Sequence, residues 1–396
     1  MQASPYGTSV KGFHEGAAPR FVRVDVLLLL AALGLIACSV YTIASATRGD
    51  IPGAPNYYVY RQAAYGGVGL LFMLVLSRVD YSRFREWKAG LYVGMIALIL
   101  AVFALGGVVR GSKRALELPF FNLQTSELGK VLLIVTLSAF MLDRMRRLSE
   151  RETTSRIMLL ALVPAMLVVA QPDLGSGLVY IAIAVAILFV AGTSWTHFAG
   201  LGALAAVALS VVLVAAPAAG VEVLKPYQTD RLTAFLNPTE NPAKQGYQQA
   251  QSLVAVGAGG KTGRGEAATQ TKLDFLPEHH TDFIFSVVGE EFGFVGAALV
   301  LSLFALLIWR CLRILTMSKN LYGCLVAAGI TAMLMFQIFV NVGMTIGIMP
   351  ITGVTLPLLS YGGSSVIVTF MAIGLLQSIH AQAREMTLAK GRDLPL

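Results

Sequence analysis

Long apolar stretches recur along the whole chain, separated by short polar segments. The hydrocarbon core of a membrane is about 30 Å thick and requires about 20 apolar residues in a helix. The pattern predicts ten such helices, at residues 24–46, 61–77, 89–109, 127–143, 157–171, 174–192, 195–217, 284–309, 321–346 and 356–379. The sequence therefore predicts an all-α polytopic membrane protein with about ten transmembrane helices.

The composition agrees with this fold class. Of the 396 residues, 56% are hydrophobic and only 13% are charged, whereas about a quarter of the residues in a soluble domain are charged. This balance excludes an ordinary soluble enzyme, a disordered chain and a disulfide scaffold. The net charge of +8 fits membrane orientation better than nucleic-acid binding, because short cytoplasmic loops are rich in Lys and Arg.

The distribution of basic residues predicts the orientation. With the N-terminus in the cytoplasm, 18 Lys and Arg residues fall inside and 11 outside, and the inside segments are the shorter ones. The sequence then divides into a cytoplasmic tail (1–23), seven spans (24–217), a large extracytoplasmic loop (218–283), three spans (284–380) and a second cytoplasmic tail (381–396). Both termini are expected in the cytoplasm.

The segment 218–283 is the one long polar connection, of about 66 residues. Connections of this length are usually functional or disordered. Its aromatic residues and the apolar run at 253–256 favour short amphipathic helices on the outer leaflet.

Asp282 is the last charged residue before the eighth span, with Phe283 and Phe285 beside it. Partial burial of a carboxylate there would raise its pKa and make it a better general base. The alternative is that Thr281 or Asp282 caps the helix. Residue type and position leave these two interpretations open.

Further charged residues fall in or beside the predicted spans. Glu127 and Lys130 are three residues apart on one helix face, which suits either a functional site or a purely structural ion pair. Asp173 is expected at the outer mouth, either at a site or as a helix cap. For Glu290 and Glu291, pairing with a buried base such as Lys130 is the favoured interpretation.

Several basic residues on the predicted outer side could bind an anion: Lys113, Arg114, Arg231, Lys261 and Arg264. The glycine-rich segment 257–265 lacks the spacing of a nucleotide-binding loop. Its backbone could still hold an anionic headgroup, although a solvated loop is the simpler interpretation. The adjacent His279 and His280 lack the spacing of a zinc site, so no structural metal is expected.

Seven motifs in this order resemble the RodA/FtsW group, also called the SEDS family (shape, elongation, division and sporulation). The motifs are Gly111-Ser-Lys-Arg114, Gln124-Thr-Ser-Glu-Leu-Gly-Lys130, Gln171-Pro-Asp-Leu-Gly-Ser176, Arg231-Leu-Thr-Ala-Phe-Leu-Asn-Pro238, Gln245-Gly-Tyr-Gln-Gln-Ala-Gln-Ser252, Leu276-Pro-Glu-His-His-Thr-Asp-Phe-Ile-Phe285 and Pro357-Leu-Leu-Ser-Tyr-Gly-Gly-Ser-Ser365. The stretch 350–357 looks most like the RodA branch. Two positions depart from the family pattern: Ala115 replaces an aromatic residue and Thr125 replaces a proline.

The resemblance implies a peptidoglycan glycosyltransferase in the bacterial cytoplasmic membrane that polymerises lipid II at its outer face. It also implies that Asp282 is the essential carboxylate and that a class B penicillin-binding protein is a partner, together with MreC and MreD of the elongation complex.

The reaction so implied would use Asp282 as base, while Arg231, with Lys113, Arg114, Lys261 and Arg264 as further candidates, binds the substrate's diphosphate. Glu127, Lys130 and Asp173 would shape the cavity. A divalent cation, Mg²⁺ or Mn²⁺, is an alternative stabiliser of the leaving group. Competing interpretations are a lipid II flippase, a division-branch polymerase and a silent scaffold.

Overall fold

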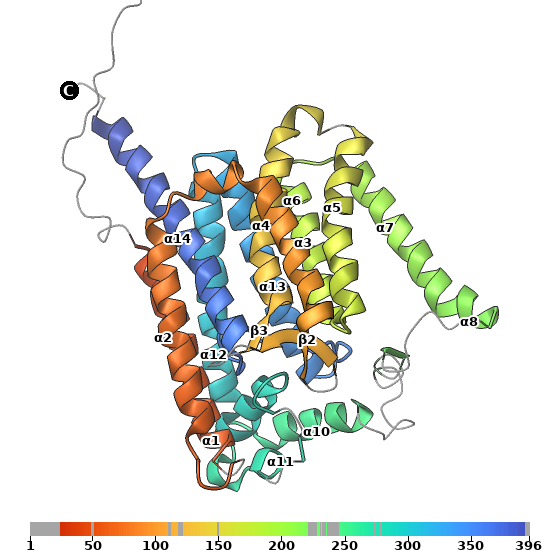
Figure 1. Cartoon of the computed structure of the whole chain (residues 1–396). Coiled ribbons are helices and arrows are strands. Elements are labelled where there is room, and N and C mark those ends of the chain that lie inside the picture. Colours follow the sequence, from red (N-terminus) through yellow and green to blue (C-terminus); the bar gives the residue numbers. More distant parts are fainter. Residues whose placement is uncertain are drawn as a thin grey trace, which may run out of the picture.

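The computed structural model describes residues 24–48, 51–109, 112–117, 122–148, 150–220, 228–229, 231, 235, 245–272, 275–276 and 279–392. The predicted tail 1–23 lies outside the described residues, as do the end of the chain and parts of the long loop. The helices form a bundle with two distinct ends (Figure 1). At one end lie β2, β3, α10 and α11, and at the other the chain runs on through the last turns of α14.

The membrane helices follow the predicted order. They are α1 (Val26–Ala46), α2 (Tyr57–Arg78), α3 (Lys88–Leu105), α4 (Thr125–Asp143), α5 (Arg151–Ala170), α6 (Leu174–Val190), α7 (Trp195–Ser210), α12 (Ile284–Met317), α13 (Leu321–Thr345) and α14 (Gly363–Arg392). A π-helical turn (Val211–Ala215) and α8 (Ala216–Ala218) extend α7. Among the described residues, nine helices are long and apolar enough to cross a membrane, and α6 is a shorter apolar helix. The chain is a multi-pass membrane protein.

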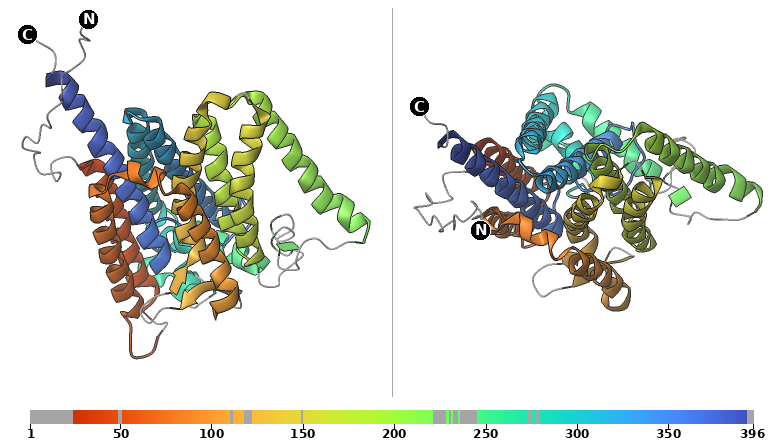
Figure 2. Two further views of the ribbon diagram at one scale, coloured as in Figure 1. Left: turned by 45° about the horizontal axis from the view of Figure 1, so that its top comes forward. Right: turned by 90° about the horizontal axis from the view of Figure 1, so that it is seen from above.

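The bundle is built around three central helices, α4, α13 and α14, which are the most buried. By contrast, α7 has no buried residue and leans away from the bundle in all views (Figures 1 and 2). Its exposed apolar surface suits contact with lipid rather than water, because the hydrocarbon of a bilayer is as apolar as leucine.

Short elements complete the two ends of the bundle. Two 3-10 turns, η2 (Tyr81–Arg85) and η3 (Met145–Arg147), lie at the end where α3 begins and α4 finishes. The long loop contributes α10 (Gln245–Ala258), the turn η5 (Gly265–Ala267) and α11 (Thr269–Lys272). The expectation of short helices is confirmed for these residues, whereas their place on the outer leaflet stays a prediction. In α10, Gln249, Ser252 and Ala255 are buried, whereas Leu253 and Val254 are exposed.

The third predicted span is wrong at its end. The helix α3 stops at Leu105, and the chain then forms β1 (Gly107–Val109), β2 (Ser112–Glu117) and β3 (Asn122–Gln124). These three short strands pair antiparallel in the order β1-β2-β3, with Val109 opposite Ser112 and Ala115 opposite Gln124. The β-branched pair Val108 and Val109 suits a strand as well as a helix, so its hydrophobicity alone did not reveal the change.

The helix α12 is broken near its start. Gly293 has a φ of 62° and a ψ of −156°, a left-handed φ that glycine adopts without steric cost. The freed backbone groups bond to the glycine-rich segment. Phe294 N–H donates to Gly260 O at 2.9 Å, Val295 N–H to Lys261 O at 3.1 Å, and Arg264 N–H donates to Glu290 O at 2.8 Å.

The segment 257–265 is therefore packed on the break in α12, and the interpretation as a solvated loop is wrong for its backbone. The expected pairing of Glu290 with Lys130 is also wrong. Its carboxylate accepts the backbone N–H groups of Thr269, Gln270 and Thr271 at 2.8, 2.9 and 3.0 Å, which fixes the first turn of α11 against α12.

A polar cluster around Asp25 ties three helices together at the opposite end. The Asp25 carboxylate caps α1 through Leu28 N–H at 3.0 Å and accepts Arg310 Nε of α12 at 3.0 and 3.1 Å. Its backbone exchanges two hydrogen bonds with the Gln377 side chain of α14. Burial alone would raise the pKa of Asp25, but the hydrogen bonds from Arg310 and Leu28 and the charge of Arg310 hold the pKa below its usual value.

Candidate functional site

A cavity of about 270 Å³ opens at the end of the bundle that carries the small sheet. Its walls come from segments far apart in the chain: α2, the strands β2 and β3, the start of α4, the turn before α12 and the segment 353–365 before and at the start of α14. Among the described residues that line it, four are charged, namely Arg61, Glu127, Lys130 and Asp282. Because burial strengthens electrostatic interactions, this cavity is the candidate functional site.

Asp282 is half-buried in the turn that precedes α12. The N-cap residue of α12 is Phe283, whose own side chain makes no capping hydrogen bond, so Thr281 and Asp282 lie just before the N-cap position. The backbone around Asp282 is held by two contacts. Asn341 Nδ2 donates to Asp282 O at 2.9 Å and to Val354 O at 2.7 Å, and Tyr361 N–H donates to His280 O at 2.9 Å.

Arg231 and Asp282 converge on Gly353. A Cβ at this glycine would lie 3.5 Å from Asp282 Oδ2 and 3.8 Å from Arg231 Nη2. Arg231 also donates from Nη1 to Thr352 O at 3.0 Å. Gly353 has a φ of +75°, which only glycine adopts readily, so the sharp turn there brings the carboxylate and the guanidinium to the same point.

Glu127 and Lys130 form a buried ion pair in the first turns of α4. Lys130 Nζ donates to Glu127 Oε1 at 2.5 Å, and both side chains are almost fully buried. The start of α4 is fixed by Ser364, whose hydroxyl accepts Gln124 N–H at 2.9 Å and donates to Asn122 O at 2.7 Å. The pair is therefore held rigidly against the cavity.

Asp173 caps α6 rather than lining the cavity. Its carboxylate accepts Ser176 N–H at 3.1 Å, and its other oxygen accepts the Ser126 hydroxyl at 2.9 Å and Gln124 Nε2 at 3.2 Å. The capping interpretation of Asp173 is confirmed. Because Gln124 and Ser176 do line the cavity, Asp173 shapes it indirectly by joining α6 to α4.

The remaining predicted residues are placed differently. Lys261 and Arg264 are exposed on the segment that packs on α12, and they are not among the residues that line the cavity. Lys113 and Arg114 lie on β2, next to the cavity-lining Ala115. Their side chains lie outside the described part of the structure.

Sequence reasoning missed Arg61 and the aromatic residues beside it. Arg61 comes from α2, donates to the Tyr57 hydroxyl and lies 5.0 Å from the centroid of the Tyr57 ring. Tyr361 also lines the cavity, and burial raises the pKa of its phenol well above the usual value, with Tyr65 adding to the shift. Tyr361 thus remains a hydrogen-bond donor at neutral pH.

A divalent cation fits the described residues poorly. The cavity is lined by two carboxylates, of which Glu127 is already paired with Lys130. Within the part of the chain that the structure describes, no three His, Cys, Asp or Glu residues come together, whereas Mg²⁺ prefers several oxygen ligands in octahedral geometry. We therefore assign no step to a metal ion.

Comparisons with known proteins agree with this geometry. The family model of the FtsW, RodA and SpoVE proteins, described as "Cell cycle protein", matches residues 21–385. Stage V sporulation protein E of Bacillus subtilis is 36% identical and covers 93% of this chain and 98% of its own. The peptidoglycan glycosyltransferase MrdB of Escherichia coli is 35% identical, covering 92% of this chain and 96% of its own.

Solved structures show the same fold. A chain from a structure titled "Structural coordination of polymerization and crosslinking by a peptidoglycan synthase complex" matches with a TM-score of 0.76 at 31% identity, covering 91% of this chain and 98% of its own. The rod shape determining protein RodA of Thermus thermophilus matches with a TM-score of 0.65 at 28% identity, covering 91% of this chain and 98% of its own. The chain belongs to the FtsW/RodA/SpoVE (SEDS) family.

Proposed function

We propose that this protein is a peptidoglycan glycosyltransferase that polymerises lipid II, with Asp282 as the general base. The observation that carries the proposal is the convergence of Asp282 and Arg231 on Gly353, beside a cavity that also contains Glu127 and Lys130. The relatives named as peptidoglycan glycosyltransferases, which include FtsW of Thioalkalivibrio sulfidiphilus at 38% identity, support the same activity.

The reaction requires a base and positive charge in one place. Joining an α-linked diphosphate donor to a growing β-linked glycan inverts the anomeric carbon, so the acceptor hydroxyl must attack in line with the departing diphosphate. Asp282 takes the proton from the acceptor 4-hydroxyl, a role that contributes about 10²–10⁴-fold to a rate. Arg231 binds the diphosphate, because a guanidinium matches phosphate oxygens in pairs.

The buried pair has a supporting role in this account. Lys130 neutralises Glu127 and holds it at the cavity wall, so both residues define the shape and charge of the acceptor side. Arg61 is a further cation among the residues that line the cavity. The lipid tail of the substrate leaves sideways into the bilayer, as its apolar chemistry requires.

The test is polymerisation of purified lipid II by the purified protein. Asp282→Asn should lower the rate by at least about 10²-fold while the melting temperature stays near that of the parent. Glu266→Gln is the matched control, since Glu266 is an exposed carboxylate that lies 3.6 Å from Arg48 and is not among the residues that line the cavity. Parental polymerisation by Asp282→Asn would refute the role of Asp282 as base.

We further propose that the protein acts in cell elongation, in complex with a class B penicillin-binding protein and with MreC and MreD. Relatives named stage V sporulation protein E, FtsW and MrdB have comparable identity, so overall identity does not distinguish these branches. The elongation role therefore rests on the stretch 350–357. Depletion should produce round cells, and filamentous cells would assign the protein to division instead.

The proposed orientation places the cavity outside the cell and both termini in the cytoplasm. The basic residues Arg144, Arg146 and Arg147 lie at the end of α4, whereas the cavity lies at its start, which agrees with short basic loops inside. Labelling of single cysteines at each terminus with a membrane-impermeant reagent checks this placement, because labelling in intact cells would contradict it.

A further inference from the structure

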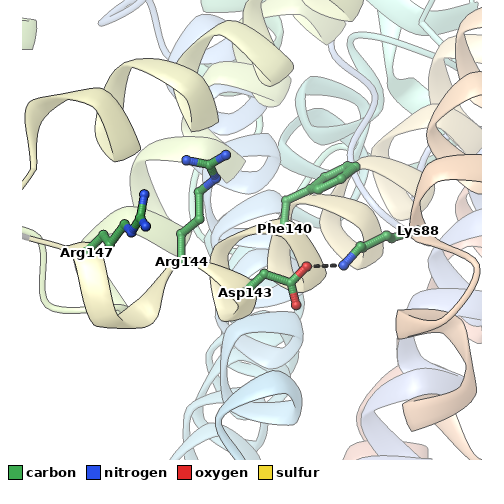
Figure 3. A pocket seen from close by; sticks show the side chains of 5 residues that line it. All are labelled: Lys88, Phe140, Asp143, Arg144 and Arg147. Carbon is green, nitrogen blue, oxygen red and sulfur yellow. Dashed lines mark hydrogen bonds and ion pairs between the residues drawn. The ribbon is translucent and has the colours of Figure 1, made fainter.

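A second cavity lies at the opposite end of the bundle from the candidate active site. It has a volume of about 350 Å³ and lies between the start of α3 and the end of α4, lined by Lys88, Phe140, Asp143, Arg144 and Arg147 (Figure 3). This volume falls within the range of about 300–1,000 Å³ that is typical of small-ligand sites. The glycosyltransferase chemistry proposed above uses none of these residues.

The charges in this cavity favour an anion. Three cationic side chains face a single carboxylate, and that carboxylate is already neutralised, because Asp143 is paired with Lys88 and with Arg85 at 3.3 Å. An adjacent cavity of about 390 Å³ contains Arg85 and Lys88 together with Glu86 and Asp143, so its charges balance. An anion is therefore attracted to the first cavity rather than to the second.

Arg144 and Arg147 are available to bind such an anion. Figure 3 shows their guanidinium groups beside the cavity, whereas the marked ion pair joins Lys88 and Asp143. Among the described residues, neither arginine side chain makes a hydrogen bond or an ion pair. The planar guanidinium presents paired donors that match phosphate oxygens, and two of them on one short turn can hold one phosphate group.

The surroundings place this cavity at the level of lipid headgroups. Trp87 directly precedes Lys88 and is 70% exposed, and tryptophan is enriched where a membrane helix meets the interface. The Phe140 ring lies 5.8 Å from Lys88 Nζ and gives the cavity an apolar wall. Farther along α3, Val93 and Leu100 are exposed apolar residues against which acyl chains can pack.

We propose that this cavity is a binding site for the phosphodiester headgroup of an anionic phospholipid. Arg144 and Arg147 hold the phosphate, Lys88 stays paired with Asp143 beside it, and the acyl chains lie along the exposed face of α3. Basic pockets between membrane helices bind anionic headgroups in this way. The proposal is independent of the glycosyltransferase activity, because the two cavities lie at opposite ends of the bundle.

Native mass spectrometry of the detergent-solubilised full chain tests the site. The protein is titrated with phosphatidylglycerol, with phosphatidylcholine, and with phosphatidylglycerol in the presence of inorganic phosphate. The parent should prefer phosphatidylglycerol about tenfold or more, and Arg144→Gln/Arg147→Gln should remove most of that preference. Arg146→Gln/Arg313→Gln is the control, since both arginines are exposed, lie outside the cavity and account for the same loss of charge.

Each outcome decides the proposal. Retained preference in the control and lost preference in the double variant support the site. An equal loss in both variants would show general attraction to a basic surface and overturn it, as would a parent without preference. If inorganic phosphate at the lipid's own concentration displaces phosphatidylglycerol completely, the site binds soluble phosphate and the lipid assignment fails. Equal melting temperatures of the three proteins confirm that the variants are folded.

Discussion

At the scale of single residues, the candidate site depends on side chains that position others. Asn341 lies on α13, is fully buried, and bonds the carbonyls of Asp282 and Val354 with one amide. It therefore fixes the turn that carries the proposed base relative to the turn at Gly353. A single asparagine in an apolar span gives no sequence signal of this role, since its partners are backbone atoms distant in the chain.

Replacing Asn341 should uncouple the two turns. Asn341→Leu leaves two buried carbonyls without a donor, at a cost of about 1–3 kcal/mol in stability, and polymerisation should fall by more than the unfolded fraction explains. Thr331→Val is the control, because the Thr331 hydroxyl bonds only within α13, to Ala327 O at 2.7 Å. Steady-state polymerisation and thermal unfolding are measured together. Normal activity in folded Asn341→Leu would contradict the positioning role.

The Glu127–Lys130 pair allows structure and function to be separated. Lys130→Met leaves a buried carboxylate without its partner, which should cost about 3–5 kcal/mol in stability. Glu127→Gln/Lys130→Met removes both charges and should recover most of the lost stability. If the double variant is stable but inactive, the pair acts in the site. If it is stable and active, the pair is purely structural, and our proposal that it sets the shape and charge of the cavity is wrong.

At the scale of elements, the break in α12 explains the glycine-rich segment. The spacing of the segment 257–265 excludes a nucleotide-binding loop, but the sequence could not show that this backbone bonds to both sides of a break in a helix about 30 residues away. The loop and the break fit because glycines face each other. A Cβ at Gly293 would lie 2.3 Å from Gly263 N, closer than atoms can approach.

Gly293→Ala should therefore destabilise the protein strongly, both through the clash and through the positive φ of 62°, which costs a non-glycine residue about 1–3 kcal/mol. Gly257→Ala is the matched control. It lies inside α10, and its Cβ would have no atom within 4 Å, so helix propensity predicts a gain of about 0.5–1 kcal/mol. Melting temperatures in detergent report both changes. Equal effects of the two substitutions would refute the close packing.

Element boundaries were predicted well at some spans and poorly at others, since α5 begins at Arg151 rather than at 157 and α12 ends at Met317 rather than at 309. The start of α12 at Ile284 and of α6 at Leu174 coincide with the predicted spans. The sequence predicts that the last span starts at 356, but α14 begins at Gly363. The segment before it is apolar, which explains the prediction, yet it folds into the turns that form the cavity wall. Hydrophobicity reports burial, and these turns are buried as deeply as a helix.

At the scale of the whole molecule, one end of the bundle carries the cavity with Asp282, and the other carries Arg144, Arg146 and Arg147. Charge counts predicted from the sequence which end faces the cytoplasm, and that orientation stays a prediction. The sequence also singled out Asp282, Glu127 and Lys130, which all line the cavity, although residue type and position alone left their roles open. It did not reveal Arg61 or the convergence of Arg231 on Gly353, since these depend on contacts between segments separated by more than 100 residues.

The Asp25 cluster stabilises the basic end by joining α1, α12 and α14. Because the pKa of Asp25 is lowered from 3.8, its contribution to stability is present above that pH and is lost as the pH falls through the folded value. Asp25→Asn should cost about 3 kcal/mol at pH 5 and progressively less toward pH 3. Thermal unfolding of parent and variant at both pH values measures this. A penalty independent of pH would contradict the ion pair with Arg310.

The most direct test of the central claim is a structure of Asp282→Asn with lipid II bound. The account predicts that the side chain of residue 282 lies within about 3.2 Å of the attacking sugar hydroxyl and that Arg231 contacts the diphosphate. A diphosphate bound elsewhere, with residue 282 turned away from both sugars, would contradict the assignment of this cavity as the site of glycan polymerisation.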